Sequence, residues 1–241
     1  GVINQPLTVA TVQAVVFFKH VAGEEYRVSL RSKGAIDVGA VAKARGGGGH
    51  RNAAGCSATG PIEYRAGGMQ YRVHYKSFFQ VNRFLVGALT EAALSDAMGG
   101  FAMDLYAGVG LFTMPLADRF EKVEAVESVR SAVEDLEVNA RRAGKAIASH
   151  RASVDLHLES VKKTPDFILA DPPRTGLGPS VVRELARLKA PRVAIVSCDP
   201  ATLARDLRGL VDAGYSIDTM TLVDLFPQTF HLETVVHLTL R

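Results

Sequence analysis

The stretch FAMDLYAGVG, residues 101–110, decides the fold of most of this 241-residue chain. Its first six residues form an apolar run typical of a buried strand, and the AGVG that follows predicts a tight turn before a helix over residues 111–119. Glycines at such a junction let the backbone approach a ligand closely. The spacing is close to a dinucleotide-binding fingerprint, but the third glycine, which lets the helix crowd against a pyrophosphate, is missing.

A second predicted strand, residues 123–126, ends in Glu127, which lies 127 − 104 = 23 residues after Asp104. A carboxylate at this place can accept hydrogen bonds from ribose hydroxyls. A ribose-binding carboxylate without a pyrophosphate-binding glycine favours S-adenosylmethionine over NAD as the cofactor. An ordinary turn followed by a surface glutamate is the alternative.

Strands alternate with helices along the rest of the chain. We expect further strands at residues 147–152, 167–170, 193–196, 217–223 and 234–240, and helices at residues 129–143, 181–188 and 201–211. This alternation predicts an α/β, Rossmann-like domain with a mostly parallel, doubly wound sheet. No helix separates the last two strands, so we expect the last strand to run antiparallel.

Two polar motifs follow expected strands at the edge where open α/β sheets bind their ligands. The first, DPPR at residues 171–174, holds Asp171 and Arg174 on a stiff turn, which suits a flipped base and its flanking phosphate. The second, SCDP at residues 197–200, places Cys198 just before a helix, where positive partial charge favours a thiolate. A structural turn and a small buried hydrophobe are the respective alternatives.

Glu233 opens the last expected strand, and the residues that follow it are apolar. A carboxylate at the mouth of a buried strand is a candidate general base with a raised pKa. The alternative is a charge on an edge strand.

The first quarter of the chain has a different character. Residues 11–21 and 26–31 predict a hairpin, residues 36–44 a short helix, and GGGGHRNAAG (residues 46–55) a backbone that can approach a phosphate or, alternatively, a flexible linker. Residues 1–60 carry 7 Lys and Arg against 3 Asp and Glu, a net charge of +4 that suits a polyanion such as RNA. We expect a domain boundary at Gly60–Pro61, followed by two short strands and a helix ending near residue 97.

Composition limits the remaining possibilities. The chain is 47% hydrophobic and 22% charged, with no apolar run long enough to span a bilayer, which is typical of a soluble globular protein. Its two cysteines favour a reducing, cytoplasmic setting and are too few for a four-cysteine iron–sulfur cluster or a Cys-rich zinc site. We therefore expect no metal site, and the oligomeric state stays open.

Five motifs in residues 61–241 resemble the RNA uracil-5-methyltransferase family and occur in that family's order. They are FFQVN (78–82), DLYAGVG (104–110), DPPRTG (171–176), SCDPATLARD (197–206) and FPQTFHLE (226–233).

The resemblance implies a class I methyltransferase acting on a uridine of rRNA or tRNA. It implies that an S-adenosylmethionine pocket is lined by Gln80, Tyr106, Glu127 and Asp171, beside the turn that contains Asp104, Gly108 and Gly110. It also implies Cys198 as the nucleophile and Glu233 as the base. Leu111 and Asp199 depart from the family's usual asparagines, and the latter places a negative charge beside the thiol.

Residues 8–60 resemble instead the DHHA1 module of DHH-family phosphoesterases, through VSLRSKG (28–34), IDV (36–38) and the Gly-rich His motif. The resemblance implies that Arg31, His50 and Arg51 contact a nucleotide or nucleic acid. The catalytic Asp-His-His domain of that family has no counterpart in this chain, so we expect no nuclease activity. In the RNA uracil-5-methyltransferase family an RNA-binding domain usually occupies the place of this segment. The resemblance therefore does not imply which RNA this chain recognises.

Three other functions stay open. The alternatives are a catalytically incomplete nucleic-acid-binding protein, the remnant of a DHH-family phosphoesterase, and a class I methyltransferase acting on a protein or small molecule. The last would not need Cys198.

Overall fold

The computed structural model describes residues 2–60, 62–74, 77–80, 82, 84–226 and 232–241. The chain divides into two compact units, Gly1–Pro61 and Ile62–Arg241. Each unit has its own hydrophobic core. Among the described residues, no helix is long and apolar enough to cross a membrane.

The first unit is an antiparallel sheet with one short helix. Its elements are the 3-10 helix η1 (Val2–Thr8), β1 (Ala14–Ala22), β2 (Glu25–Ser32), α1 (Val38–Lys43), β3 (Gly48–His50) and β4 (Ala53–Thr59), and the strand order is β1-β2-β4-β3. The expected hairpin forms from β1 and β2. The Oδ1 of Asp37 caps α1 by accepting a hydrogen bond from the Ala40 N–H at 2.9 Å. Val28 and Leu30 of β2 pack against this helix.

The Gly-rich run is a packed strand rather than a linker. A Cβ on Gly47 would lie 2.2 Å from the carbonyl oxygen of Gly55, and Gly49 has a φ of +139°. Only glycine fits there, because β3 pairs closely with β4. Strand β4, AAGCSAT, is missing from the sequence-based expectations, because its small residues have little strand preference of their own.

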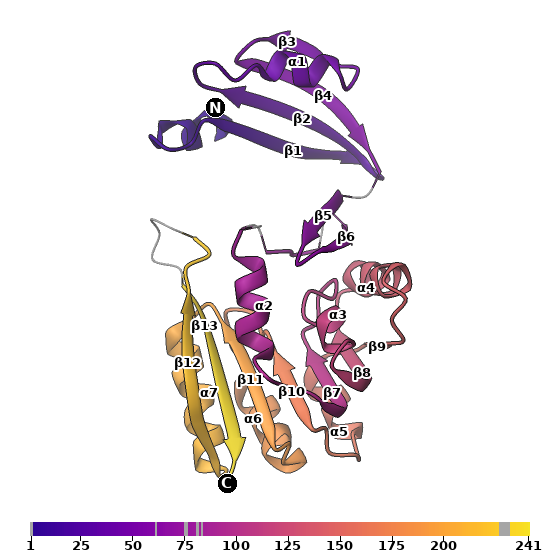
Figure 1. Cartoon of the computed structure of the whole chain (residues 1–241), viewed down its shortest axis with the longest axis vertical. Coiled ribbons are helices and arrows are strands. Elements are labelled where there is room, and N and C mark those ends of the chain that lie inside the picture. Colours follow the sequence, from indigo (N-terminus) through magenta and orange to yellow (C-terminus); the bar gives the residue numbers. More distant parts are fainter. Residues whose placement is uncertain (1, 61, 75–76, 81, 83, 227–231) are drawn as a thin grey trace. The chain divides into compact units, whose positions relative to one another are not determined.

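The second unit is built on a seven-stranded sheet. Its strands are β7 (Gly99–Leu105), β8 (Phe120–Glu127), β9 (Ala148–Arg151), β10 (Phe167–Ala170), β11 (Arg192–Ser197), β12 (Tyr215–Val223) and β13 (Glu233–Leu240). They lie in the order β12-β13-β11-β10-β7-β8-β9 (Figure 1). Neighbouring strands are parallel except for β13, which runs antiparallel to both β11 and β12. The predicted doubly wound sheet and its antiparallel last strand are thus confirmed.

Helices cover both faces of this sheet (Figure 1). Residues of α2 (Val86–Leu94), α3 (Thr113–Leu116) and α4 (Arg130–Arg142) pack on one face, and residues of α5 (Val154–Ser160), α6 (Gly178–Leu188) and α7 (Pro200–Asp212) on the other. Every strand of this sheet except the edge strand β9 supplies residues to both cores, because successive side chains of a strand point to opposite faces. In β7, for example, Ala102 joins the first core and Met103 the second.

Two helices differ from expectation. Helix α3 is only four residues long, although a helix was expected over residues 111–119. Helix α5 was not expected at all, because its seven residues bury only Val154 and Leu158, too few apolar positions to establish a helical period.

A small hairpin precedes the sheet. Strands β5 (Ile62–Ala66) and β6 (Met69–Val73) turn at Gly67 and Gly68, whose φ values are +55° and +79°. The side chain of Asn139 in α4 holds β6: its Oδ1 accepts the Arg72 N–H at 2.7 Å, and its Nδ2 donates to the Arg72 carbonyl at 3.0 Å.

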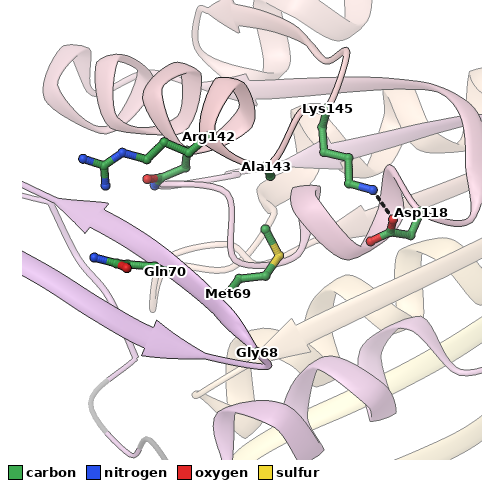
Figure 2. A pocket seen from close by; sticks show the side chains of 8 residues that line it. Gly68, Met69, Gln70, Asp118, Arg142, Ala143 and Lys145 are labelled. Carbon is green, nitrogen blue, oxygen red and sulfur yellow. Dashed lines mark hydrogen bonds and ion pairs between the residues drawn. The ribbon is translucent and has the colours of Figure 1, made fainter.

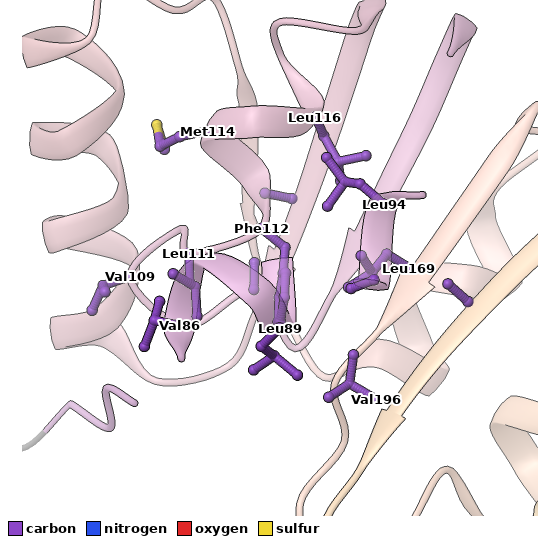
Figure 3. Close-up of a cluster of buried hydrophobic side chains, with 14 of the residues drawn as sticks. Val86, Leu89, Leu94, Val109, Leu111, Phe112, Met114, Leu116, Leu169 and Val196 are labelled. Atoms are coloured by element: carbon purple, nitrogen blue, oxygen red, sulfur yellow. The ribbon is translucent and has the colours of Figure 1, made fainter. Parts of the chain in front are cut away.

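Leu89 of α2 tests the packing on the first face of the sheet. It is fully buried in the cluster of Figure 3. Leu89→Ala should lower the free energy of unfolding by about 2–5 kcal/mol, because the deleted methyl groups leave a cavity. Chemical denaturation followed by circular dichroism measures this loss. The matched control is Leu156→Ala on α5, where the side chain is 64% exposed and a change within about 0.5 kcal/mol is expected. Equal losses in the two variants would contradict the assigned core.

Candidate active site

The Gly-rich turn after β7 is tied to the end of β8 by one carboxylate. Glu127 accepts the Gly108 N–H on Oε2 at 3.0 Å and the Val129 N–H on Oε1 at 2.7 Å. The turn has left-handed φ values of +63° at Tyr106, +55° at Gly108 and +98° at Gly110. Glu127 therefore lies directly beside the backbone that the sequence assigned to cofactor binding.

Asp104 is fully buried at the end of β7. Its Oδ2 accepts a hydrogen bond from the Thr113 hydroxyl, whereas its Oδ1 has no hydrogen-bond partner among the described residues. Burial raises the pKa of Asp104 to about 7; the Thr113 bond opposes this rise and the charge of Glu127 adds to it. The carboxyl is thus poised to change protonation near neutral pH.

A cavity of about 330 Å³ lies at the carboxyl ends of the strands. It is lined by Tyr106, Glu127, Ser128, residues 152–155 after β9, and Pro173 and residues 175–181 after β10. This is the edge at which ligands of open α/β sheets bind, and strand order reverses on either side of β7. Burial, then the charges of Asp155 and Asp206, raise the pKa of Tyr106 to about 12, so its hydroxyl stays neutral.

The other predicted cofactor residues do not line this cavity. Gly108 and Gly110 belong to the adjoining turn. Asp171 follows β10, and its N–H donates to the Leu105 carbonyl at 3.2 Å. Gln80 is buried, and its Oε1 has no hydrogen-bond partner among the described residues.

Sequence reasoning missed one positioning residue, Asp206 of α7. Its Oδ2 accepts the Leu177 N–H at 2.7 Å and its Oδ1 accepts the Gly178 N–H at 3.3 Å, which holds the cavity wall after β10. A Cβ on Gly176 would lie 2.3 Å from this carboxylate. Asp206 stands in the SCDPATLARD motif, so the signal was present, but its contact is not local in sequence.

A larger cavity, of about 520 Å³, lies elsewhere, between the β5–β6 hairpin and the end of α4 (Figure 2). None of the predicted site residues lines it. Its two cations are already paired, Lys145 with Asp118 and Arg142 with Glu63. The smaller cavity at the strand ends is therefore the better candidate for the cofactor.

Strand register brings Cys198 and Glu233 to the same end of the sheet. Cys198 directly follows β11, Glu233 is the first residue of β13, and Ser197 lies opposite Thr234 in the antiparallel pair that these strands form. Glu233 is 5% exposed, and Cys198 is half-buried. The remainder of the motif that ends at Glu233, residues 227–231, lies outside the described residues.

The charges around the thiol oppose its ionisation. Burial first, then the negative charge of Glu233, raise the pKa of Cys198, and Asp171 adds to this effect. Arg174, which is exposed, opposes it. These effects act in the direction opposite to the one expected from the helix N-terminus, which favours the thiolate.

Asp199 acts as a helix cap. Its Oδ1 accepts the Thr202 N–H at 2.8 Å, and these hydrogen bonds hold the pKa of Asp199 below its usual value. The strongest unfavourable charge on Cys198 comes from Glu233, not from this neighbour in sequence.

Glu233 and Asp171, the two carboxyls whose charges oppose ionisation of Cys198, have raised pKa values themselves. Burial raises the pKa of Glu233, with Arg174 opposing the rise. Burial also raises the pKa of Asp171 well above its usual value, and the charges of Glu233 and Asp104 add to it. A carboxyl with a raised pKa binds its proton more tightly, which is the property required of a general base near neutral pH.

In the first unit, two of the three predicted nucleotide contacts meet through strand register. Ala53 of β4 lies opposite Arg31 of β2 and opposite His50 of β3. Arg51 follows directly in the turn, where its Nη2 donates to the Ala35 carbonyl at 3.1 Å. His50 and Arg51 are exposed.

Asp104→Asn should change how stability depends on pH. The unfolded aspartate ionises near pH 3.9, whereas the folded one keeps its proton to about pH 7. Between these values the native state binds more protons, so wild-type stability should fall relative to Asp104→Asn as pH rises, by about 1.4 kcal/mol per pH unit at most. Urea denaturation at a series of pH values measures the difference. The exposed Asp224→Asn is the control, and a flat difference for Asp104→Asn would show that the buried carboxyl is not protonated.

Two known protein families match this chain. The family described as tRNA (Uracil-5-)-methyltransferase matches residues 37–241, and the DHHA1 domain matches residues 1–66. Both resemblances expected from the sequence are thereby confirmed.

The alignments with individual relatives include most of this chain but less than half of each relative. An uncharacterized RNA methyltransferase of Thermotoga maritima is 39% identical over 173 residues, covering 70% of this chain and 39% of the relative. One of Streptomyces avermitilis is 40% identical over 181 residues, covering 72% and 42%. This chain thus spans about two-fifths of the length of these relatives.

Among solved structures, the Pyrococcus abyssi tRNA (uracil-54, C5)-methyltransferase in complex with S-adenosyl-L-homocysteine is similar to this chain. Its TM-score is 0.68 and its sequence identity 32%, and the match covers 79% of this chain and 47% of that one. A precorrin-6y C5,15-methyltransferase of Geobacter metallireducens, at 11% identity and a TM-score of 0.57, shares the fold alone. Fold, motif order and family match lead to one conclusion: the chain belongs to the tRNA (uracil-5-)-methyltransferase family and carries a DHHA1 domain at its start.

Proposed function

We propose that this chain transfers a methyl group from S-adenosylmethionine to C5 of a uridine in rRNA or tRNA, through a covalent bond between Cys198 and the uracil. The observation that carries the proposal is the pairing of β11 with β13, which sets Cys198 and Glu233 at one end of the sheet. A methyltransferase that acts on a protein or small molecule would not need this cysteine. The two cysteines of the chain leave no place for a four-cysteine iron–sulfur cluster, and such a low count suits the reducing cytoplasm.

The residues around the smaller cavity fit S-adenosylmethionine. Glu127 offers carboxylate oxygens that can accept hydrogen bonds from ribose hydroxyls. Two buried oxygens without a hydrogen-bond partner among the described residues are further acceptors: Oδ1 of Asp104, at the end of β7, and Oε1 of Gln80, before α2. Asp155, a carboxyl in the cavity lining whose hydrogen bonds lower its pKa, favours a cationic ligand. When bound, S-adenosylmethionine supplies an electrophilic methyl group on a positively charged sulfur.

The chemistry requires both catalytic groups because C5 of uracil is a weak nucleophile. Cys198 attacks C6 as a thiolate, which makes C5 enolate-like and able to take the methyl group. Glu233 then removes the proton from C5, and the C6–sulfur bond breaks to restore the double bond and free the thiolate. The target base must first leave its stack, and Arg174 at the exposed edge suits its flanking phosphate.

We further propose that the DHHA1 unit binds nucleotides or nucleic acid through Arg31, His50 and Arg51. Its support is the cross-strand row that joins Arg31, Ala53 and His50, together with the net charge of +4 over residues 1–60. This unit would add affinity for RNA without contributing to methyl transfer.

Cys198→Ala should abolish methyl transfer. We expect a loss of about 10⁴-fold or more, because without the thiolate C5 is not activated. The measurement is transfer of tritiated methyl groups to unmodified rRNA and tRNA transcripts, with 5-methyluridine identified by nucleoside mass spectrometry. Cys56→Ser, the same loss of a thiol in the other unit, should keep its activity. Calorimetric titration of the wild type with S-adenosylmethionine accompanies the assay, and no binding would favour a catalytically incomplete nucleic-acid-binding protein.

Glu233→Gln should trap the covalent complex with RNA. The variant loses the base, which slows turnover about 10²- to 10⁴-fold, yet it also loses the negative charge that most opposes Cys198 ionisation. Attack on C6 should therefore continue while release stops. A denaturing gel with labelled RNA should show a shifted band that requires both S-adenosylmethionine and Cys198. Slow turnover without such a band would assign Glu233 a role other than base.

A further inference from the structure

Two histidines and a glutamate meet at the β9 edge of the sheet, where the sequence predicts no metal site. Glu124 comes from β8, His150 from β9 and His157 from α5. Each offers one ligand atom, and the three atoms lie within 4.8 Å of one another. Oε2 of Glu124 lies 3.5 Å from Nε2 of His150 and 3.7 Å from Nε2 of His157.

The two imidazole nitrogens are buried and unsatisfied. Neither Nε2 has a hydrogen-bond partner among the described residues, and both distances to Glu124 exceed a normal hydrogen bond. The side chains of His157 and Glu124 are 11% and 15% exposed, and that of His150 is 36% exposed. Both nitrogens lie within ion-pair distance of the same carboxylate oxygen, but that attraction holds only for a protonated imidazole. Buried polar atoms without a hydrogen bond are rare and costly, so two imidazole nitrogens aimed at one carboxylate oxygen require an explanation. A shared ligand between the three atoms supplies one.

The donor set and its spacing suit a divalent transition metal. Imidazole nitrogen and carboxylate oxygen bind Zn²⁺ at about 2.0–2.2 Å, which separates two ligand atoms of a tetrahedral site by about 3.3 Å. The distances of 3.5 and 3.7 Å are close to that value. The other carboxylate oxygen, Oε1, is held by the Lys122 ammonium, which orients Oε2 toward the histidines as an outer partner of a metal ligand does.

We propose that Glu124 Oε2, His150 Nε2 and His157 Nε2 form a site for Zn²⁺ or a similar divalent transition metal, with water in the fourth position. The site joins three elements: β8, the four-residue edge strand β9 that pairs with it, and the short helix α5.

The position of the site gives it a structural role. Glu127, which lines the cofactor cavity, lies three residues beyond Glu124 on β8. Residues 152–155, another wall of that cavity, connect His150 to His157. A metal bound here fixes both walls, so it stabilises the fold and orders the cavity without touching the reacting atoms.

The test uses untagged full-length protein freed of metal with a chelator. Titration with ZnSO₄, followed by gel filtration and elemental analysis, should show one Zn²⁺ per chain and a higher Tm. Co²⁺ should give the visible absorption of a tetrahedral site with nitrogen and oxygen ligands. Loss of a residue that only orients a metal ligand typically lowers metal affinity by about 10- to 100-fold. His157→Gln and Glu124→Gln each remove a ligand, so each should lower Zn²⁺ affinity by more than this.

Controls separate this site from other metal-binding groups. His20→Gln, in the first unit, and Cys198→Ser should each retain one Zn²⁺ with wild-type affinity. Circular dichroism of the metal-free proteins shows whether the variants fold. If a variant does not fold, the Co²⁺ spectrum of the wild type still tests the site. Binding that disappears in Cys198→Ser, or persists unchanged in folded His157→Gln, overturns the proposal, as does the absence of stoichiometric Zn²⁺ from the wild type.

Discussion

The antiparallel pairing of β13 with β11 is the constraint on which the candidate active site depends. Parallel strands bring only their carboxyl ends to the ligand edge of a sheet, so β10 and β11 deliver Asp171 and Cys198 there. An antiparallel strand delivers the residue at its start instead, and β13 begins with Glu233. A shift of this register by one residue would turn the Glu233 side chain to the opposite face of the sheet. The core residues Val235 and Val236 resist that shift, since each is fully buried on its own face.

Because acidic groups and Cys198 lie at the same edge of the sheet, their charges oppose ionisation of the thiol that the proposed chemistry needs. Burial raises the pKa values of Asp104, Asp171 and Glu233, and the charges of Glu233 and Asp104 raise that of Asp171 further. Burial and the charge of Glu233 also raise the pKa of Cys198, which opposes formation of the thiolate. Arg174 opposes these effects at both Cys198 and Glu233. A cationic ligand in the adjoining cavity would act in the same direction as Arg174, so cofactor binding and thiol activation would be coupled through charge.

Sequence patterns were sufficient wherever structure is local or periodic. The apolar strands and their polar ends predicted the sheet and its ligand edge, and glycine spacing predicted the turn that Glu127 holds. They were insufficient where the determining contact is distant. Strand β4 exists because it pairs with β2, and helix α5 because Val154 and Leu158 reach the core. The metal-ligand cluster combines residues 33 positions apart (157 − 124), with no short spacing motif to reveal it.

Strand β8 connects the proposed metal site at Glu124 with the Gly-rich turn that Glu127 holds. Glu124, Val126 and the histidine-bearing elements lie on the α5 face, whereas Glu127 at the strand's end reaches the Gly-rich turn. Only Ala125 and Val126 lie between Glu124 and Glu127, in a strand that is paired on both sides. Any group that fixes Glu124 therefore also limits where the Glu127 carboxylate can lie. Since that carboxylate already holds the Gly108 and Val129 N–H groups, the geometry available to a ribose is set by this strand rather than by the loops around it.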